Sequence, residues 1–154
     1  RCLCYTAAPM GERDQNSISS VYFRSREKHV FHMSRVAVIG ASKNRAKFGN
    51  KAVRAYASRG HEVFPVHPFE SEIEDLVCSA SIMEISGEVD IVSVYLPPEK
   101  LFGILPEIAE KGCQELWLNP GTESGEVLER AEALGLNVIE ECSIVGLGLS
   151  PSMF

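Results

Sequence analysis

Short apolar runs alternate with amphipathic segments along most of this chain. Five runs rich in branched or aromatic residues, bounded by Gly, Pro or Asn, predict strands. They are Val36–Ile39, Glu62–Val66, Ile91–Tyr95, Glu115–Leu118 and Asn137–Ile139. Residues 47–59, 98–111 and 124–133 lie between them and have apolar positions at helical spacing. We therefore predict an α/β fold: a doubly wound parallel sheet (Rossmann-like) of about five strands in three layers, α/β/α.

The ends and one internal stretch are less regular. Residues 69–88 predict a short strand around Leu76–Cys78 and a helical turn near Ser81–Ile85. The apolar tail from Cys142 to Phe154 is expected to pack along the sheet or on a partner. Residues 1–33 show no sustained period, so we predict an N-terminal extension followed by one domain over residues 34–154. The extension is either an artificial addition upstream of a natural start near Met33 or a genuine arm.

Charge is distributed unevenly. The chain has a net charge of −6, yet the segment from Ser34 to Gly60 carries seven basic residues and no acidic one. Such a local positive cluster in an acidic protein predicts an anionic ligand. The overall acidity argues against nucleic acid, and no apolar run is long enough to span a membrane. The five scattered cysteines indicate reduced thiols and a cytoplasmic protein.

Metal binding is not predicted. Cys2-x-Cys4 and His29-x-x-His32 are the two local clusters of ligand-type residues, and neither has a zinc spacing. Ligands of parallel sheets instead lie at the carboxyl ends of the strands. That rule selects five segments: Gly40–Lys47, Val66–Pro68, Tyr95–Pro98, Leu118–Gly121 and Glu141–Ser143.

The first of these segments has the features of a phosphate-binding loop. Gly40 permits a tight turn, and the small residues Ala41 and Ser42 let a phosphate approach the backbone. The following helix offers its amino terminus to an anion, and three side chains add positive charge. These are Lys43, Arg45 and Lys47. The alternative is an ordinary strand–helix turn on a basic surface.

Two motifs typical of NAD-binding domains are missing, which narrows the choice of ligand. The loop is not G-x-G-x-x-G, and the second strand ends in Val66-His67-Pro68 without the acidic residue that usually binds the NAD ribose. NAD is therefore disfavoured, while the basic cluster leaves NADP open. Tyr95–Pro98 predicts a rigid apolar wall, although proline at the start of a helix explains it equally well. Asn119-Pro120-Gly121 is also explained by a turn alone.

The order of several motifs carries more information than any one of them. VAVIGAS, KFGNKAV, EVFPVHP, VDIVSVYLPPE, WLNPG and IEECSIV follow one another over residues ~35–146. In this order they resemble the small stand-alone CoA-binding proteins, which are similar to the N-terminal CoA-binding domain of the succinyl-CoA synthetase α subunit. The resemblance implies that Gly40–Lys43 and the helix start at Phe48 hold CoA phosphates. It places the later loops around the adenosine and pantetheine.

The binding residues predicted in this way come from all five loops. They are Gly40, Ala41, Ser42, Lys43, Arg45, Lys47, Phe48, His67, Pro68, Tyr95, Leu96, Pro97, Pro98, Asn119, Gly121 and Cys142. The chain departs from the family at His67, where Asn is usual, and at Phe69–Ser71, where the synthetase has a lysine. Both departures bear on contacts after the second strand and on affinity for the 3′-phosphate.

Catalysis is not predicted for this chain alone. The synthetases need a phosphorylated histidine on a second domain, and no Ser–His–Asp set or carboxylate pair stands out here. Cys142 either lies near the CoA thiol, where it would form a mixed disulfide under oxidation, or simply packs the strand end. The sequence thus predicts a module that binds CoA or an acyl-CoA without turnover. The alternatives are an NADP-binding oxidoreductase fragment and a non-catalytic interaction subunit with a vestigial nucleotide site. A protein partner or homo-oligomer is left open.

Overall fold

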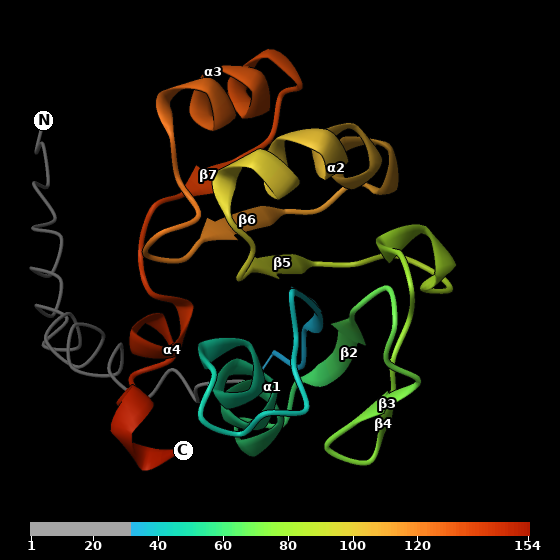
Figure 1. The fold of residues 1–154 in the computed structure, drawn as a ribbon, viewed down its shortest axis with the longest axis vertical. Coiled ribbons are helices and arrows are strands. Elements are labelled where there is room, and N and C mark those ends of the chain that lie inside the picture. The colour runs from blue at the N-terminus through green and yellow to red at the C-terminus, as the bar shows by residue number, and fades with distance from the viewer. Residues whose placement is uncertain (1–31) are drawn as a thin grey trace, which may run out of the picture. The chain divides into compact units, whose positions relative to one another are not determined.

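A five-stranded parallel sheet forms the centre of the molecule. The computed structural model describes residues 32–154, and its sheet has the order β2-β1-β5-β6-β7. The strands are β1 (Arg35–Ile39), β2 (Glu62–Val66), β5 (Ile91–Val94), β6 (Glu115–Leu118) and β7 (Val138–Ile139). The order of strands reverses between β1 and β5, which are direct neighbours (Figure 1). The predicted doubly wound, Rossmann-like fold is confirmed.

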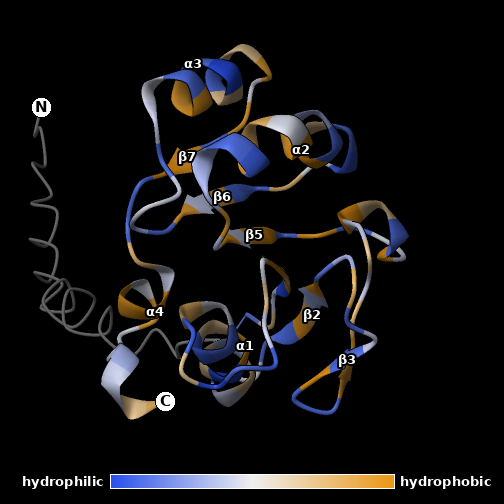
Figure 2. Ribbon diagram, in the orientation of Figure 1, coloured by the Kyte–Doolittle hydropathy of each residue, from blue (hydrophilic) through white to orange (hydrophobic). Residues whose placement is uncertain are grey.

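Helices cover both faces of the sheet. Helices α2 (Pro98–Lys111) and α3 (Gly125–Ala133) lie on one face, and α1 (Phe48–Ser58) and the short α4 (Ser143–Gly146) lie on the other (Figure 1). Each longer helix has an apolar stripe toward the sheet and polar residues outward (Figure 2). The two resulting cores are separate: Leu101, Leu105 and Ile108 of α2 belong to one, and Val53 and Tyr56 of α1 belong to the other.

The predicted elements agree with the structure to within a residue or two at their ends. The irregular stretch after β2 contains more order than its sequence indicates. It forms an antiparallel pair, β3 (Glu72–Ile73) with β4 (Leu76–Val77), and then a 3-10 turn at Ile82–Glu84. The hairpin turns at Glu74 and Asp75, which both have positive φ angles, 51° and 60°. Two-residue strands are too short to show periodicity, so only β4 was expected.

The tail after β7 packs along the sheet, one of the two predicted outcomes. It forms α4 and then a 3-10 turn at Pro151–Met153. Ile144 is fully buried in the core beneath α1. Among residues 32–154, no helix is both long and apolar enough to cross a membrane.

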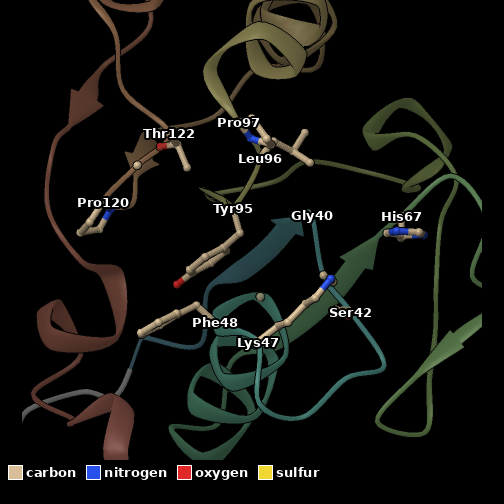
Figure 3. Close-up of a pocket in the computed structure, with 13 residues that line it drawn as sticks. Gly40, Ser42, Lys47, Phe48, His67, Tyr95, Leu96, Pro97, Pro120 and Thr122 are labelled. Carbon is tan, nitrogen blue, oxygen red and sulfur yellow. The ribbon is translucent and has the colours of Figure 1, made fainter.

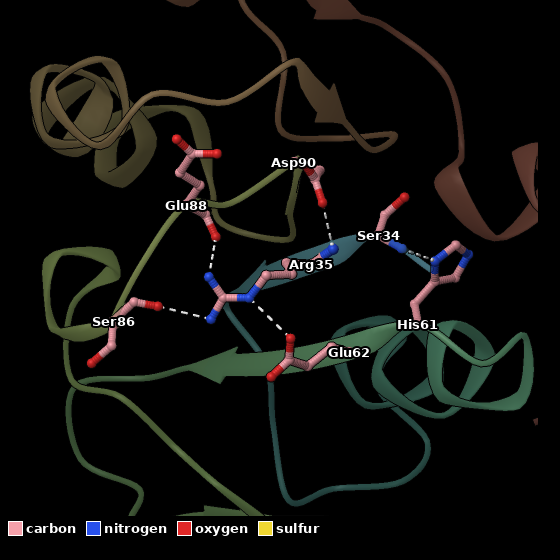
Figure 4. Close-up of polar contacts among 7 residues, drawn as sticks. All are labelled: Ser34, Arg35, His61, Glu62, Ser86, Glu88 and Asp90. Atoms are coloured by element: carbon pink, nitrogen blue, oxygen red, sulfur yellow. Dashed lines mark hydrogen bonds and ion pairs between the residues drawn. The ribbon is translucent and has the colours of Figure 1, made fainter. Parts of the chain in front are cut away.

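At the amino-terminal edge of the sheet, Arg35 links neighbouring segments by hydrogen bonds. The Arg35 guanidinium donates to Glu62 Oε2 at 2.9 Å, to the carbonyl of Ser86 at 2.8 Å and to the carbonyl of Glu88 (Figure 4). Its backbone N–H donates to Asp90 Oδ2 at 2.7 Å. These bonds join β1, β2 and the segment before β5, so the polar groups of this edge are engaged in holding strands together. The opposite, carboxyl edge is where the structure leaves room for a ligand.

Candidate functional site

A pocket of about 420 Å³ lies at the carboxyl edge of the sheet, over the switch point between β1 and β5. Four loops that are far apart in the sequence line it, namely those that follow β1, β2, β5 and β6 (Figure 3). Its lining residues are Gly40, Ala41, Ser42, Lys47, Phe48, Gly49, His67, Tyr95, Leu96, Pro97, Pro120, Gly121 and Thr122. This is the position at which open α/β sheets bind their ligands.

Two glycines allow the first loop to fold closely over the sheet. Gly40 has a φ of 82°, and a Cβ there would lie 2.7 Å from the Tyr95 carbonyl oxygen. A Cβ on Gly49 would lie 2.3 Å from the carbonyl oxygen of Gly40. Neither position accepts a side chain, because real Cβ contacts do not fall below about 3 Å. The two glycines therefore set the distance between the loop and the start of α1.

Side chains fix the shape of this loop. Ser42 Oγ accepts a hydrogen bond from the N–H of Asn44 at 3.2 Å, and Asn44 Oδ1 accepts one from the N–H of Ala46 at 3.0 Å. Fully buried Asn50 donates its Nδ2 to the Ser42 carbonyl at 2.8 Å and to Glu74 Oε1 at 2.9 Å. The loop is thus held from within and from α1 before any ligand arrives.

The amino terminus of α1 is the part of the pocket best suited to an anion. No side chain caps it, and its first turn has no acidic residue. Within the described part of the chain, nothing accepts a hydrogen bond from the N–H groups of Phe48 and Gly49. Helix α3 differs, because Ser124 caps it and Glu126 lies in its first turn. The dipole and free donors of α1, with Lys47 beside them, suit a phosphate or diphosphate.

Exposed Glu123 follows the pocket-lining residues Gly121 and Thr122 on the β6 loop and places its carboxylate beside this far end of the pocket. Glu123 Oε2 accepts hydrogen bonds from the N–H groups of Gly121 and Thr122 at 2.8 and 3.0 Å. Its own N–H and these two donors hold the pKa of the Glu123 carboxyl below its usual value. This end of the pocket therefore has no free backbone donors at Gly121 and Thr122 for a phosphate.

A buried polar network supports the pocket wall from behind. Tyr95 OH and Ser93 Oγ lie 3.0 and 2.9 Å from Ser143 Oγ. Asn119 donates Nδ2 to Ser93 Oγ and to the Val94 carbonyl, and its Oδ1 accepts from the Ser143 N–H at 2.8 Å. Burial raises the pKa of Tyr95, so its hydroxyl stays protonated. The network joins β5, β6 and α4, and the Tyr95 ring faces the pocket as a neutral wall.

A second, more apolar pocket of about 380 Å³ adjoins the first and shares Gly40, His67 and Leu96 with it. It lies beside the end of β2 and is also lined by Pro68, Phe69 and Lys100, among others. Phe69 is 90% exposed, so its ring has one free face. Together the two pockets form a continuous path from the end of β2, past the start of α1, to the β6 loop.

The structure brings most of the residues predicted for the site to this edge. Ten of them line the first pocket: Gly40, Ala41, Ser42, Lys47, Phe48, His67, Tyr95, Leu96, Pro97 and Gly121. Pro68 lines the second pocket, and Pro98 lies at a different one between α2 and α3. Gly49, Pro120 and Thr122 line the first pocket but were not among the residues predicted. Pro120 falls inside the selected segment Leu118–Gly121, whereas Gly49 and Thr122 lie just beyond the selected segments.

The remaining predicted residues lie elsewhere. Lys43 pairs with Glu70 at 2.7 Å, which raises the pKa of Lys43, and Arg45 pairs with Glu74 at 3.2 Å. Asn119 belongs to the buried network, and half-buried Cys142 packs beside the α1 core at the start of α4. Glu74 lies in the turn of the β3–β4 hairpin and Glu70 lies just before β3. The sequence did not reveal that this segment lies near the loop.

Between residues 32 and 154, no group of three or more His, Cys, Asp or Glu side chains is arranged to hold a metal ion. Cys2, Cys4 and His29 lie outside the described residues.

The sheet order, with a glycine-lined pocket at its switch point, defines a Rossmann-like domain of the doubly wound class. Within that class the chain belongs to the CoA binding domain family, which it matches over residues 34–147. The predicted resemblance to CoA-binding proteins is thereby confirmed.

Small proteins are among its relatives. A conserved hypothetical protein from Pyrococcus furiosus is 36% identical, with a TM-score of 0.68 over 74% of this chain and 99% of that one. The uncharacterized protein YneT of Bacillus subtilis is 29% identical over 71% of this chain and 82% of its own length.

Larger enzymes contain a similar domain. An ADP-forming acetate–CoA ligase II from Archaeoglobus fulgidus is 33% identical over 56% of this chain, and the α subunit of ligase II from Pyrococcus furiosus is 29% identical over 72%. The matched regions make up 13% and 27% of those proteins. A dinucleotide-forming acetyl-coenzyme A synthetase from Ca. Korarchaeum cryptofilum has a TM-score of 0.62 at 26% identity, with 70% of this chain covered.

Proposed function

We propose that this domain binds coenzyme A or an acyl-CoA at the carboxyl edge of its sheet, without catalytic turnover of its own. The observation that carries the proposal is the amino terminus of α1, uncapped and beside a loop whose two glycines leave no room for a Cβ. It is a cradle of the size and charge that a diphosphate needs. Membership of the CoA binding domain family supports the choice of CoA over other diphosphate-bearing ligands.

The path formed by the two pockets suggests how the ligand lies. The diphosphate occupies the Gly40–Gly49 loop, near Lys47 and the N–H groups of Phe48 and Gly49. The adenosine extends toward the end of β2, where doubly wound folds hold the ribose, and the apolar second pocket offers a surface for the adenine. The pantetheine then runs the other way, past Tyr95 and toward the β6 loop.

Absence of turnover is part of the proposal. Ser42 Oγ accepts from the N–H of Asn44, and Tyr95 OH is paired with the Ser143 hydroxyl. Neither of these two hydroxyl groups in the first pocket is hydrogen-bonded to a side chain that could act as its general base. The thiols of Cys78, Cys113 and Cys142 are free, which suits the reducing cytoplasm in which we place the protein.

Calorimetric titration tests the proposal directly. We expect heat on addition of CoA or acetyl-CoA and none with NAD under the same conditions. Binding of NADP with no competition from CoA would instead identify a dinucleotide domain. Absence of binding by both forms of CoA would refute the proposal and favour a vestigial site.

A charge reversal in the pocket is the matched test of the binding mode. Lys47→Glu is expected to weaken CoA binding roughly 10- to 100-fold, as loss of a charge-assisted phosphate contact does. Arg130→Glu is the control, because the substitution changes the net charge by the same amount. Arg130 lies on α3, over the Phe102 ring, and does not line the first pocket. Equal effects of the two variants, measured by calorimetry, would show that Lys47 does not contact the ligand.

A further inference from the structure

The β6 end of the pocket differs from the diphosphate-binding end in its hydrogen-bond donors and in its charge. Pro120 and Thr122 form one side of it, and Tyr95, just after β5, and Phe48, at the start of α1, approach it (Figure 3). Gly121 also lines the pocket. If the diphosphate occupies the start of α1, the thiol or thioester of the ligand reaches this end. The groups found here therefore select the acyl group.

The hydrogen-bond donors that Gly121 and Thr122 bring to this end already have acceptors within the protein. Thr122 Oγ1 donates to the carbonyl of Asn119 at 2.8 Å, and the N–H groups of Gly121 and Thr122 donate to Glu123. Tyr95 OH is paired with the buried Ser143 hydroxyl. A carboxylate on the acyl chain would have to displace one of these bonds in order to find a donor.

The charged side chain that the β6 loop itself carries is acidic. From Gly112 to Phe154 the chain contains a single Lys or Arg, Arg130, which is placed over Phe102 of α2. The loop itself carries Glu123, whose lowered pKa keeps it ionised at neutral pH. Two nearby cations lie at the start of α1. Lys47 lies at the diphosphate, and Lys51 Nζ donates to the Pro151 carbonyl at 2.8 Å.

We infer that the domain discriminates by acyl charge: it accepts free CoA or a CoA thioester of an uncharged acid, and it disfavours thioesters of dicarboxylic acids. The inference rests on the proposed function, because it needs CoA in the orientation given above. Glu123 is the specificity-determining residue. Its carboxylate occupies the donors that a second carboxylate would use, and it repels that carboxylate at the same time.

Butyryl-CoA and succinyl-CoA form the matched ligand pair, since both acyl chains have four carbons and they differ chiefly in a terminal carboxylate. Competition calorimetry against CoA at low ionic strength is expected to give a dissociation constant for succinyl-CoA roughly fivefold or more above that for butyryl-CoA. Glu123→Gln retains an oxygen acceptor for Gly121 and Thr122 but removes the charge. It is expected to narrow the difference between the two ligands.

Glu132→Gln is the control variant, because it removes the same charge from the exposed face of α3. It is expected to leave the ratio of the two affinities unchanged. If CoA binds but succinyl-CoA binds as tightly as butyryl-CoA, the inference is wrong while the proposed function stands. If CoA, butyryl-CoA and succinyl-CoA all fail to bind, the proposed function itself is wrong. If Glu123→Gln and Glu132→Gln change the ratio of the succinyl-CoA and butyryl-CoA dissociation constants equally, Glu123 does not determine the specificity.

Discussion

At the scale of single residues, Asn119 is a buried polar side chain that joins several parts of the fold by hydrogen bonds. It is 1% exposed and makes three hydrogen bonds, to Ser93, to the Val94 carbonyl and from the Ser143 N–H. The sequence motif Asn119-Pro120-Gly121 suggested a turn or a ligand contact. The structure confirms the turn, which the Thr122 N–H closes onto the Asn119 carbonyl at 3.0 Å. The Asn119 side chain supports the pocket from behind the wall that Tyr95 forms.

Loss of this side chain is expected to destabilise the fold. Asn119→Ala leaves the buried N–H of Ser143 and the Val94 carbonyl without these partners, so the free energy of unfolding should fall by about 2–4 kcal/mol. Asn137→Ala is the control, since exposed Asn137 makes one bond, to the Gln114 carbonyl. It should cost less than about 1 kcal/mol in the same urea titration. Similar losses for both variants would contradict the role given to Asn119.

Cys113 provides a residue-scale prediction about pH. Burial raises the pKa of its thiol to about 11, so the neutral form is favoured in the folded protein. Its alkylation at pH 8 should be roughly a hundredfold slower than that of an unperturbed thiol, and should accelerate as the pH approaches 11. Because the pKa is higher in the folded state, the stability that the thiol contributes is present below pH 9 and is lost as the pH rises through about 11. Peptide mapping after timed alkylation measures the rate, and rapid labelling at pH 8 would contradict the assignment.

At the scale of elements, the loop and the first turn of α1 behave as one unit. Gly40 and Gly49 touch through backbone atoms, and Asn50 ties the same turn to Ser42 and to the β3–β4 hairpin. The glycines and the basic residues of this unit are visible in the sequence. The hairpin contact is not, because it depends on how residues 24 positions apart meet in space.

Two glycine-to-alanine substitutions distinguish the effect of close packing on stability from the effect of helix propensity. Gly49→Ala places a Cβ 2.3 Å from the Gly40 carbonyl oxygen, so stability should fall by about 1–3 kcal/mol and CoA binding should weaken. Gly103→Ala in α2 meets nothing within 4 Å and should raise stability by up to about 1 kcal/mol. Thermal denaturation compares the two variants. A Gly49→Ala protein as stable as the unaltered chain would disprove the close approach.

At the scale of the whole molecule, charge and packing are organised around the sheet. The basic cluster belongs to β1, its loop and α1, whereas within residues 34–154 every acidic residue follows Gly60. Two separate hydrophobic clusters cover the two faces of the sheet. The division of the chain near residue 33 stays a prediction, which truncation can test.

A chain beginning at Met33 is expected to fold by itself, because residues 34–154 supply every strand of the five-stranded sheet and the buried residues of both clusters. Its melting temperature should lie within a few degrees of that of the full 154-residue chain, and unfolding should be cooperative. Circular dichroism measures both. Loss of a cooperative transition would mean that residues 1–32 are needed for the fold.

The sequence by itself determined the succession of strands and helices, and with it the edge of the sheet at which the candidate pocket lies. It could do so because apolar periodicity and turn residues are local properties, and parallel topology then places the carboxyl ends of strands together. Only the tertiary structure decided which polar groups are free for a ligand. Lys43 is paired with Glu70 just before β3, Arg45 is paired with Glu74 of the β3–β4 turn, and Glu123 accepts from the N–H groups of the β6 loop. The two ion pairs depend on distances between segments remote in the sequence, and the Glu123 contacts depend on local backbone geometry, so neither follows from the pattern of residue types.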